Sequence, residues 1–182
     1  AHTEVPVNGT LCITGDPNID DIVNTNAVAL MIAMLLDQQM SIELAFAGPS
    51  RLADRIGGTL TAGAVGDMAV DDLVAIFAVK PALHRFPAAM AQRTHALCTH
   101  LVEHYAGDPC AIWTNEPDAR VVAKRLRALP GFGPEKTKIF VAVLAKRFGI
   151  TPEGWQAAAG AFSDSTPRSV ADVSDPTVLV EI

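Results

Sequence analysis

The stretch that decides the fold of this chain is Leu129-Pro130-Gly131-Phe132-Gly133-Pro134-Glu135-Lys136-Thr137. Its two glycines bracket one apolar residue, so the chain can reverse through positive φ angles and a second backbone can approach closely. Pro134 stands where a helix would begin, which leaves the next three N–H groups unpaired at the positive end of a helix dipole. Such an end binds anions. The stretch therefore predicts a phosphate-binding turn, with a plain C-cap and tight turn between packed helices as the alternative.

The segments on both sides of this turn have the apolar spacing of amphipathic helices. Apolar residues recur at three- and four-residue steps over 119–129 and again over 137–148, which predicts a helical hairpin at about 119–148. Eight of the fourteen Lys and Arg lie between Arg120 and Arg147, against one acid, Glu135. The chain as a whole has a net charge of −6. The positive field is therefore local to the hairpin, where it suits a phosphate contact.

The remaining sequence predicts an all-α protein with irregular ends. Residues 27–37 are apolar almost all round, which is typical of a buried central helix, and Ser41 opens the next helix. Asn8-Gly9 between β-prone residues predicts a small β-hairpin over 5–13. Residues 163–182 are rich in Ser, Asp and Pro, so we expect an irregular, poorly anchored tail. Further helices are expected over 52–56, 69–79, 87–105 and 154–162.

Length and composition predict one unit over residues 1–182, with no membrane partner. At 182 residues and 49% hydrophobic content the chain can bury one substantial core. Its most apolar run, 27–36, is too short for the roughly 20 residues that cross a bilayer. Cys12, Cys98 and Cys110 have no metal-ligand spacing, so we expect buried thiols in a reducing compartment, without zinc or an iron–sulfur cluster. We expect a cytoplasmic monomer, nucleoid-associated if the source is prokaryotic.

The glycine turn and its flanks resemble the helix-hairpin-helix motif of the base-excision DNA glycosylases related to endonuclease III and the 3-methyladenine glycosylases. A second stretch agrees in type and order, and the resemblance spans roughly residues 22–162. It implies two helical lobes with a DNA cleft between them. Hairpin residues would then hold the phosphates of lesion-bearing double-stranded DNA; these are Gly131, Gly133, Glu135, Lys136, Thr137 and Lys138. The second stretch is Leu35-Leu36-Asp37-Gln38-Gln39-Met40-Ser41.

That second stretch resembles the junction with which these enzymes support an opened duplex. A glutamine or an apolar side chain there fills the gap left by an extruded base. Gln39 is the favoured wedge, with Gln38 beside it, because an amide both donates and accepts without carrying a charge. Met40 is the apolar alternative. Taken alone, the Gln38-Gln39 pair is more typical of a polar helix terminus, and the hairpin is what brings the two interpretations level.

The catalytic group is where the sequence departs from the family. The resemblance implies an aspartate about twenty residues after the second hairpin glycine, and Glu153 stands there. The extra methylene displaces the charge, and such a shift can cost on the order of a hundredfold in rate. Glu153 is also explained as an exposed acid at a helix start. Trp155, two residues on, is the candidate wall of a base pocket.

The resemblance implies a monofunctional glycosylase that hydrolyses the N-glycosidic bond of a damaged or mispaired base. Glu135 occupies the position of the lysine nucleophile of bifunctional members, so water would attack. No cofactor or side-chain metal site is expected, although hairpin carbonyls can hold a monovalent cation. The alternatives are a non-catalytic damaged-DNA-binding protein on the same scaffold and a helical interaction module without nucleic acid.

Overall fold

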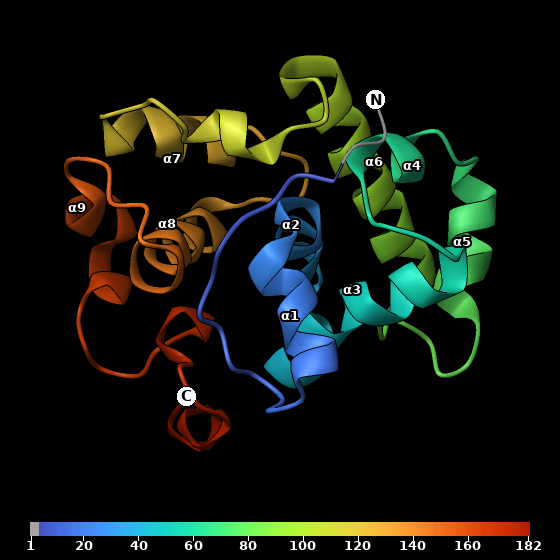
Figure 1. Ribbon diagram of the computed structural model, residues 1–182, viewed down its shortest axis with the longest axis horizontal. Coiled ribbons are helices and arrows are strands. Elements are labelled where there is room, and N and C mark those ends of the chain that lie inside the picture. Colours follow the sequence, from blue (N-terminus) through green and yellow to red (C-terminus); the bar gives the residue numbers. More distant parts are fainter. Residues whose placement is uncertain (1–3) are drawn as a thin grey trace.

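The computed structural model describes residues 4–182, and within this range the chain is helical, without a β-strand (Figure 1). This confirms the prediction of an all-α protein. The α-helices are α1 Pro17–Thr25, α2 Ala27–Leu36, α3 Ile42–Ile56, α4 Ala62–Gly66, α5 Val70–Ala78, α6 Pro87–Tyr105, α7 Ala119–Arg127, α8 Pro134–Phe148 and α9 Trp155–Ala159. Short 3-10 helices lie at η1 Pro109–Ile112, between α6 and α7, and after α9 at η2 Gly160–Ser163, η3 Val170–Asp172 and η4 Pro176–Glu181.

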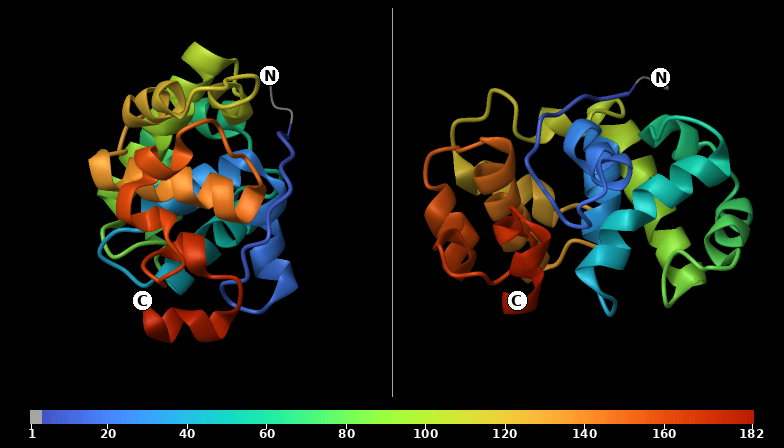
Figure 2. Two further views of the ribbon diagram at one scale, coloured as in Figure 1. Left: turned by 90° about the vertical axis from the view of Figure 1, so that its left-hand side faces the viewer. Right: turned by 60° about the horizontal axis from the view of Figure 1, so that its bottom comes forward.

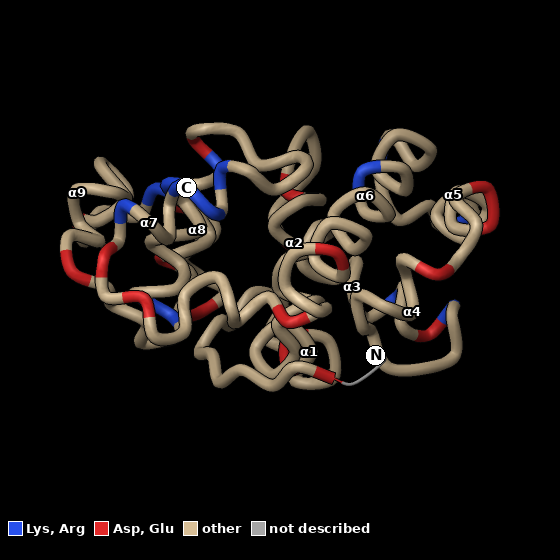
Figure 3. The backbone as a smooth tube through the Cα atoms, turned by 90° about the horizontal axis from the view of Figure 1, so that it is seen from above, with Lys and Arg blue, Asp and Glu red and all other residues tan. Residues whose placement is uncertain are grey.

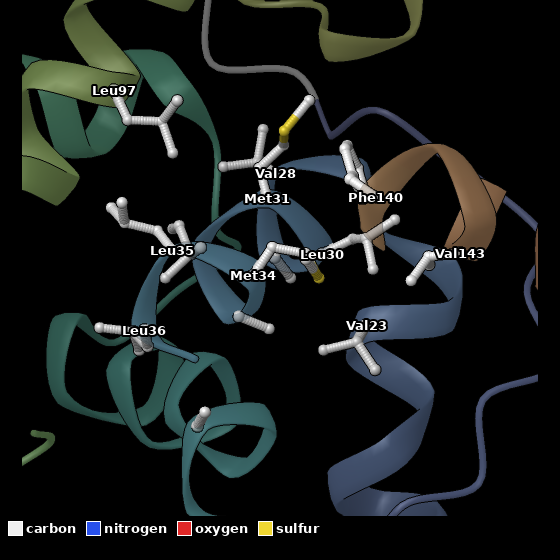
Figure 4. Close-up of a cluster of buried hydrophobic side chains, with 14 of the residues drawn as sticks. Val23, Val28, Leu30, Met31, Met34, Leu35, Leu36, Leu97, Phe140 and Val143 are labelled. Atoms are coloured by element: carbon white, nitrogen blue, oxygen red, sulfur yellow. The ribbon is translucent and has the colours of Figure 1, made fainter. Parts of the chain in front are cut away.

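Helix α2 is the centre of the core, as its apolar sequence predicts. All ten of its residues are buried, and it packs on α1, α3, α6 and η1. Figure 4 shows its side chains between Leu97 of α6 and Phe140 and Val143 of α8. Asn26 caps the first turn, because its side-chain oxygen accepts hydrogen bonds from the N–H groups of Val28 and Ala29 at 3.0 and 3.2 Å.

The other helices lie on two sides of α1 and α2 (Figures 1 and 2). On one side α4 and α5 pack against α6, while α3 packs on α2 and α5. On the other side α8 packs against α7, α9 and η3. The end of α2 that leads into Gln38 lies between these two groups of helices, with Arg93 of α6 on one side and Lys136 of α8 on the other.

Helix ends fall largely where side-chain signals place them. Ser41 caps α3, and its hydroxyl accepts from the N–H of Leu44 at 3.3 Å. Gly57 (φ 74°) ends α3, and Gly149 (φ 68°) ends α8. Helix α3 runs unbroken through the region where the sequence predicted a separate helix over 52–56, because Pro49 is accommodated inside it.

The predicted N-terminal β-hairpin is wrong. Residues 5–13 form an extended arm that bonds to distant segments instead of folding back on itself. The N–H of Gly9 donates to Asn24 O at 2.8 Å, and the N–H of Thr10 donates to Arg147 O at 2.9 Å. A side chain at Gly9 would collide with Phe148, so this glycine allows close packing of the arm rather than a turn.

The tail is irregular, as predicted, but it is firmly anchored, which corrects the second half of that prediction. Val170, Ala171 and Val173 are buried against the core. Asp172 forms an ion pair with Lys146 of α8 at 2.6 Å, and both side chains are largely shielded from solvent. Short apolar residues scattered among Ser and Asp give no periodic signal, which is why sequence patterning missed this packing.

Candidate nucleic-acid interface

The glycine turn that joins α7 to α8 is held by two buried apolar residues. Leu129 and Phe132 point inward at 3% exposure each, and the ring of Phe132 meets that of Phe140 edge-on, with centroids 5.9 Å apart. Gly131 adopts φ 85°, a conformation that favours glycine. A Cβ at Gly131 would also collide with Leu35 of α2. The first glycine of the motif is therefore required by the fold itself.

The second glycine faces open space at the start of α8. Gly133 is the N-cap of α8, and no side chain caps this helix end. No atom lies within 4 Å of the position that a Cβ would occupy, and the φ of −81° suits any residue. Thr137 turns back into the helix end, where its hydroxyl donates to Gly133 O at 2.8 Å. Glu135 is exposed in the first turn. The amide end of α8 is thus sterically open to an anion.

Lys136 does not face solvent with its hairpin neighbours. Its Nζ donates hydrogen bonds to the carbonyl oxygens of Met34, Leu35 (3.2 Å) and Asp37 (3.4 Å), at the C-terminal end of α2. The last carbonyl oxygens of a helix have few partners within the helix, and a cation suits the negative end of the dipole. Lys136 therefore fastens the start of α8 to the end of α2, and so brings the glycine turn next to the Gln38-Gln39 junction.

Burial sets the electrostatics of this contact. Desolvation lowers the pKa of Lys136 to about 8, although the nearby Asp37 acts in the opposite direction. Desolvation also raises the pKa of Asp37, with Lys136 opposing the shift. Arg93 of α6 adds a second positive charge close enough to lower the pKa of Lys136 further. The junction thus concentrates two cations and one half-buried carboxylate.

A cationic groove runs along the outer side of α7 and α8. It has a volume of about 330 Å³ and no acid in its lining, which is Arg120, Ala123, Lys124, Arg127, Pro134, Thr137, Lys138 and Ala158. Lys124, Arg127 and Lys138 are exposed and have no ion pair or hydrogen bond through their side chains within residues 4–182. Lys138 follows Lys136 by two residues, about 200° round the helix, which is why the two lysines face different neighbours.

The other cationic side chains of the basic segment bind groups within the protein. Arg125 donates to Ile112 O at 3.0 Å and pairs with Glu116 at 3.3 Å. Lys146 holds the tail through Asp172. Arg120 pairs with Asp118 at 3.0 Å but stays largely exposed. Figure 3 shows the Lys and Arg positions gathered on α7 and α8. Fewer cationic side chains are therefore free to bind a ligand than the sequence count indicates, and those that are free lie mainly in the groove.

The Gln38-Gln39 junction lies directly after α2. Gln38 is fixed: its amide nitrogen donates to Leu35 O at 3.0 Å, and its oxygen accepts from Arg93 at 3.1 Å. Gln39 is exposed and adopts φ 57°, a left-handed conformation that is uncommon outside glycine. Met40 packs partly against the core. Of the three predicted wedge residues, Gln39 is the one that presents its side chain to solvent.

Glu153 and Trp155 lie apart from the glycine turn. Glu153 follows the C-terminal end of α8, and 15 residues of helix, about 22 Å, separate that end from Gly133. The backbone of Glu153 pairs with the N-terminal end of α7, with Ala119 N donating to Glu153 O at 3.0 Å. Its side chain lines a cavity of about 500 Å³ with Asp118 and Arg120. Trp155 does not line this cavity; it packs half-buried against the core.

Sequence reasoning missed the residues that hold the junction from the other side. His84, 3% exposed, lies against Gln38 O at 2.9 Å and Leu36 O at 3.1 Å through Nε2. Arg93 reaches Gln38 from α6. Both come from segments about 50 residues downstream, and neither belongs to a local motif. Only the tertiary fold brings them to the junction.

Within residues 4–182, no cluster of three or more His, Cys, Asp or Glu side chains could bind a metal ion. No helix in the described part of the chain combines the length and apolar character needed to span a bilayer. No protein-family model and no curated protein sequence matches this chain.

Proposed function

We propose that this protein binds lesion-bearing duplex DNA through the α7–α8 hairpin and hydrolyses the N-glycosidic bond of a damaged or mispaired base. The observation that carries the proposal is the contact between two motifs about 100 residues apart, the glycine turn and the Gln38-Gln39 junction, through Lys136 and Gly131. Phosphates would sit at the open end of α8, and the groups of helices on either side of α2 would form the two lobes of the cleft.

The charge distribution supports phosphate binding at the hairpin. The groove places four cations along α7 and α8, and three of them have no acidic partner in residues 4–182. Pro134 belongs both to this groove and to the first turn of α8, so the cations and the open helix end are continuous. A phosphate at the N-terminus of α8 would therefore meet amide donors and positive charge together.

Gly133→Ala is the sharpest test of this binding mode. The position has ordinary φ and free space, so the substitution leaves the fold intact, but the methyl group stands where a phosphate would approach. We expect weaker binding to a labelled duplex in fluorescence anisotropy. Gly58→Ala is the matched control, because Gly58 is equally unobstructed and lies at the far end of α3. Equal affinity of the two variants would contradict contact at the turn.

The catalytic half of the proposal assigns Glu153 as the carboxylate that stabilises the developing positive charge. We expect Glu153→Gln to abolish abasic-site formation in a panel of duplexes, each with one modified base, while DNA affinity stays within about twofold. Base release that is unchanged in the variant would remove Glu153 from the reaction.

A non-catalytic damaged-DNA-binding protein is the second candidate, and the position of Glu153 favours it. The carboxylate lies beyond the far end of α8 from the glycine turn, next to the N-terminus of α7. This candidate predicts the same salt-sensitive, Gly133-dependent binding, but no abasic-site formation by the wild-type protein on any member of the panel.

A further inference from the structure

A pocket beside the Gln38-Gln39 junction has the features of a site for a single flat, polar ring. It has a volume of about 250 Å³ and is formed by the junction, the segment before α6 and the first turns of α6. That volume is below the range typical of sites for drug-sized ligands. Its walls include Gln39, Phe86 and Arg93, and no acidic residue lines it. The glycosylase proposal does not use Phe86.

His84 makes this pocket a built site rather than a chance hollow. Its Nε2 donates to Gln38 O and Leu36 O, while its Nδ1 accepts from the N–H of Phe86 at 2.9 Å. These bonds require the neutral tautomer with the proton on Nε2. One buried imidazole therefore ties the wall that carries Gln39 to the wall that carries Phe86, and fixes the distance between them.

Phe86 and Gln39 supply the two kinds of contact that a nucleobase needs. Phe86 is 45% exposed, and the Arg85 guanidinium lies over its ring, 5.7 Å from the centroid. An aromatic ring can stack on any base, and a cation close to the ring adds to its attraction for a nucleotide. Gln39 has no side-chain hydrogen bond within residues 4–182, so its amide can pair with the edge of a stacked ring.

Charge selects among flat ligands. Arg93 lines the pocket, Arg85 lies over the Phe86 ring, and Lys136 binds the end of α2, so the positive charge around the pocket favours an anionic ligand. The phosphates of a DNA strand would interact favourably with these positive charges when one of its bases enters the pocket. A cationic ring would instead need acidic residues around the pocket. We propose that this pocket binds an unstacked nucleobase of a DNA strand, with the base stacked on Phe86 and its edge on Gln39. This inference rests on the proposed function and assigns it a second contact.

The test compares a fully paired duplex with the same duplex carrying a single-nucleotide bulge, by fluorescence anisotropy at one salt concentration. The wild-type protein should bind the bulged duplex about tenfold more tightly. Phe86→Ala should remove this preference and leave the affinity for the paired duplex unchanged, whereas Phe86→Trp should retain it. Val79→Ala, which truncates another exposed apolar residue, serves as the control and should retain it.

The outcomes separate the pocket from the hairpin. An equal preference for the bulge in Phe86→Ala and wild-type protein overturns the pocket assignment, and Gly133-dependent binding of the paired duplex then still stands. A wild-type protein that binds the bulged duplex only, in a Phe86-dependent manner, upholds the pocket and ends the hairpin proposal. Failure to bind either duplex overturns both.

Discussion

At the scale of single residues, the two glycines of the turn have opposite roles. Gly131 is required by the fold, because its φ is 85° and Leu35 occupies the space that a side chain would need. Gly133 is free of both constraints. Glycine is a favoured N-cap residue, and at Gly133 the lack of a side chain also leaves the amide end of α8 open to a ligand.

We expect Gly131→Ala to lower the free energy of unfolding by about 2–4 kcal/mol, from left-handed backbone strain together with overpacking against Leu35. Urea denaturation monitored by circular dichroism measures the change. Gly133→Ala should cost less than about 1 kcal/mol, the ordinary difference between glycine and alanine at an N-cap. Equal losses in the two variants would contradict the different roles of the two positions.

Lys136 gives a pH-dependent contribution to stability whose sign is set by burial. Its pKa is lowered to about 8 in the folded protein, from 10.5. Between these values the unfolded chain carries a proton that the folded protein has lost, so the free energy of unfolding rises with pH over this window.

We therefore expect wild-type protein to gain stability relative to Lys136→Met as the pH rises from about 8 to about 10. Urea denaturation of both proteins across that range measures the gain, and the groups that they share cancel in the difference. At pH 7 the variant also leaves Asp37 O without the lysine donor, which costs about 1–3 kcal/mol. A difference that does not vary with pH would mean that the lysine titrates normally.

At the scale of elements, the sequence predicts helices well where apolar periodicity and capping residues coincide. Helices α2, α6 and α8 have their predicted apolar faces and end close to the expected residues. Helix α1 was not predicted as a separate element, although Asp16 followed by Pro17 is an N-cap signal. The predicted turn at Asn8-Gly9 does not form, because the backbone of the arm makes its hydrogen bonds to α1 and α8 and not to itself.

The candidate site could be predicted only in part. The glycine turn and the Gln38-Gln39 junction could both be found from the sequence, because each is a contiguous stretch. The rest of the site depends on contacts between residues about 40 to 100 positions apart in the sequence. These contacts are the bonds of Lys136 to the end of α2, of Arg93 to Gln38, and of His84 to Gln38. A hairpin position does not reveal which side of α8 meets α2, because that depends on how the other helices pack.

For the α7–α8 element we expect Lys124→Ala with Lys138→Ala to weaken duplex binding and to reduce the slope of log affinity against log salt by about one for each lost phosphate contact. Anisotropy titrations at several salt concentrations measure the slope. Lys80→Ala, at an exposed position after α5, is the charge-matched control and should leave the slope unchanged. An unchanged slope in the double variant would place the phosphates elsewhere.

At the scale of the whole molecule, the N-terminal arm joins α1 to α8 and to the tail. The side chain of Asn24 in α1 accepts from the N–H of Leu11 at 2.8 Å and donates to Leu11 O at 2.7 Å. Thr10 bonds to Arg147 at the end of α8, and the N–H of Cys12 donates to Val173 O in the tail at 3.4 Å. The first and last segments of the chain thus pack together.

We expect Asn24→Ala to lower the free energy of unfolding by about 2–3 kcal/mol, because both backbone groups of the buried Leu11 lose their partner. Hydrogen exchange should show faster exchange in residues 5–13 and in the end of α8 together. Asn18→Ala, at an exposed position in the same helix, is the control and should change neither measurement. Faster exchange in the arm alone would mean that the arm does not couple α1 to α8.

The arm limits how far α8 can move away from α1. Such a movement would have to break either the bonds between Thr10 and Arg147 or those between Leu11 and Asn24. A ligand that contacts both the cationic groove and the Gln38-Gln39 junction would therefore have to bend to reach both. Flexible ligands would bind more tightly than stiff ligands of equal charge, because bending them costs less free energy.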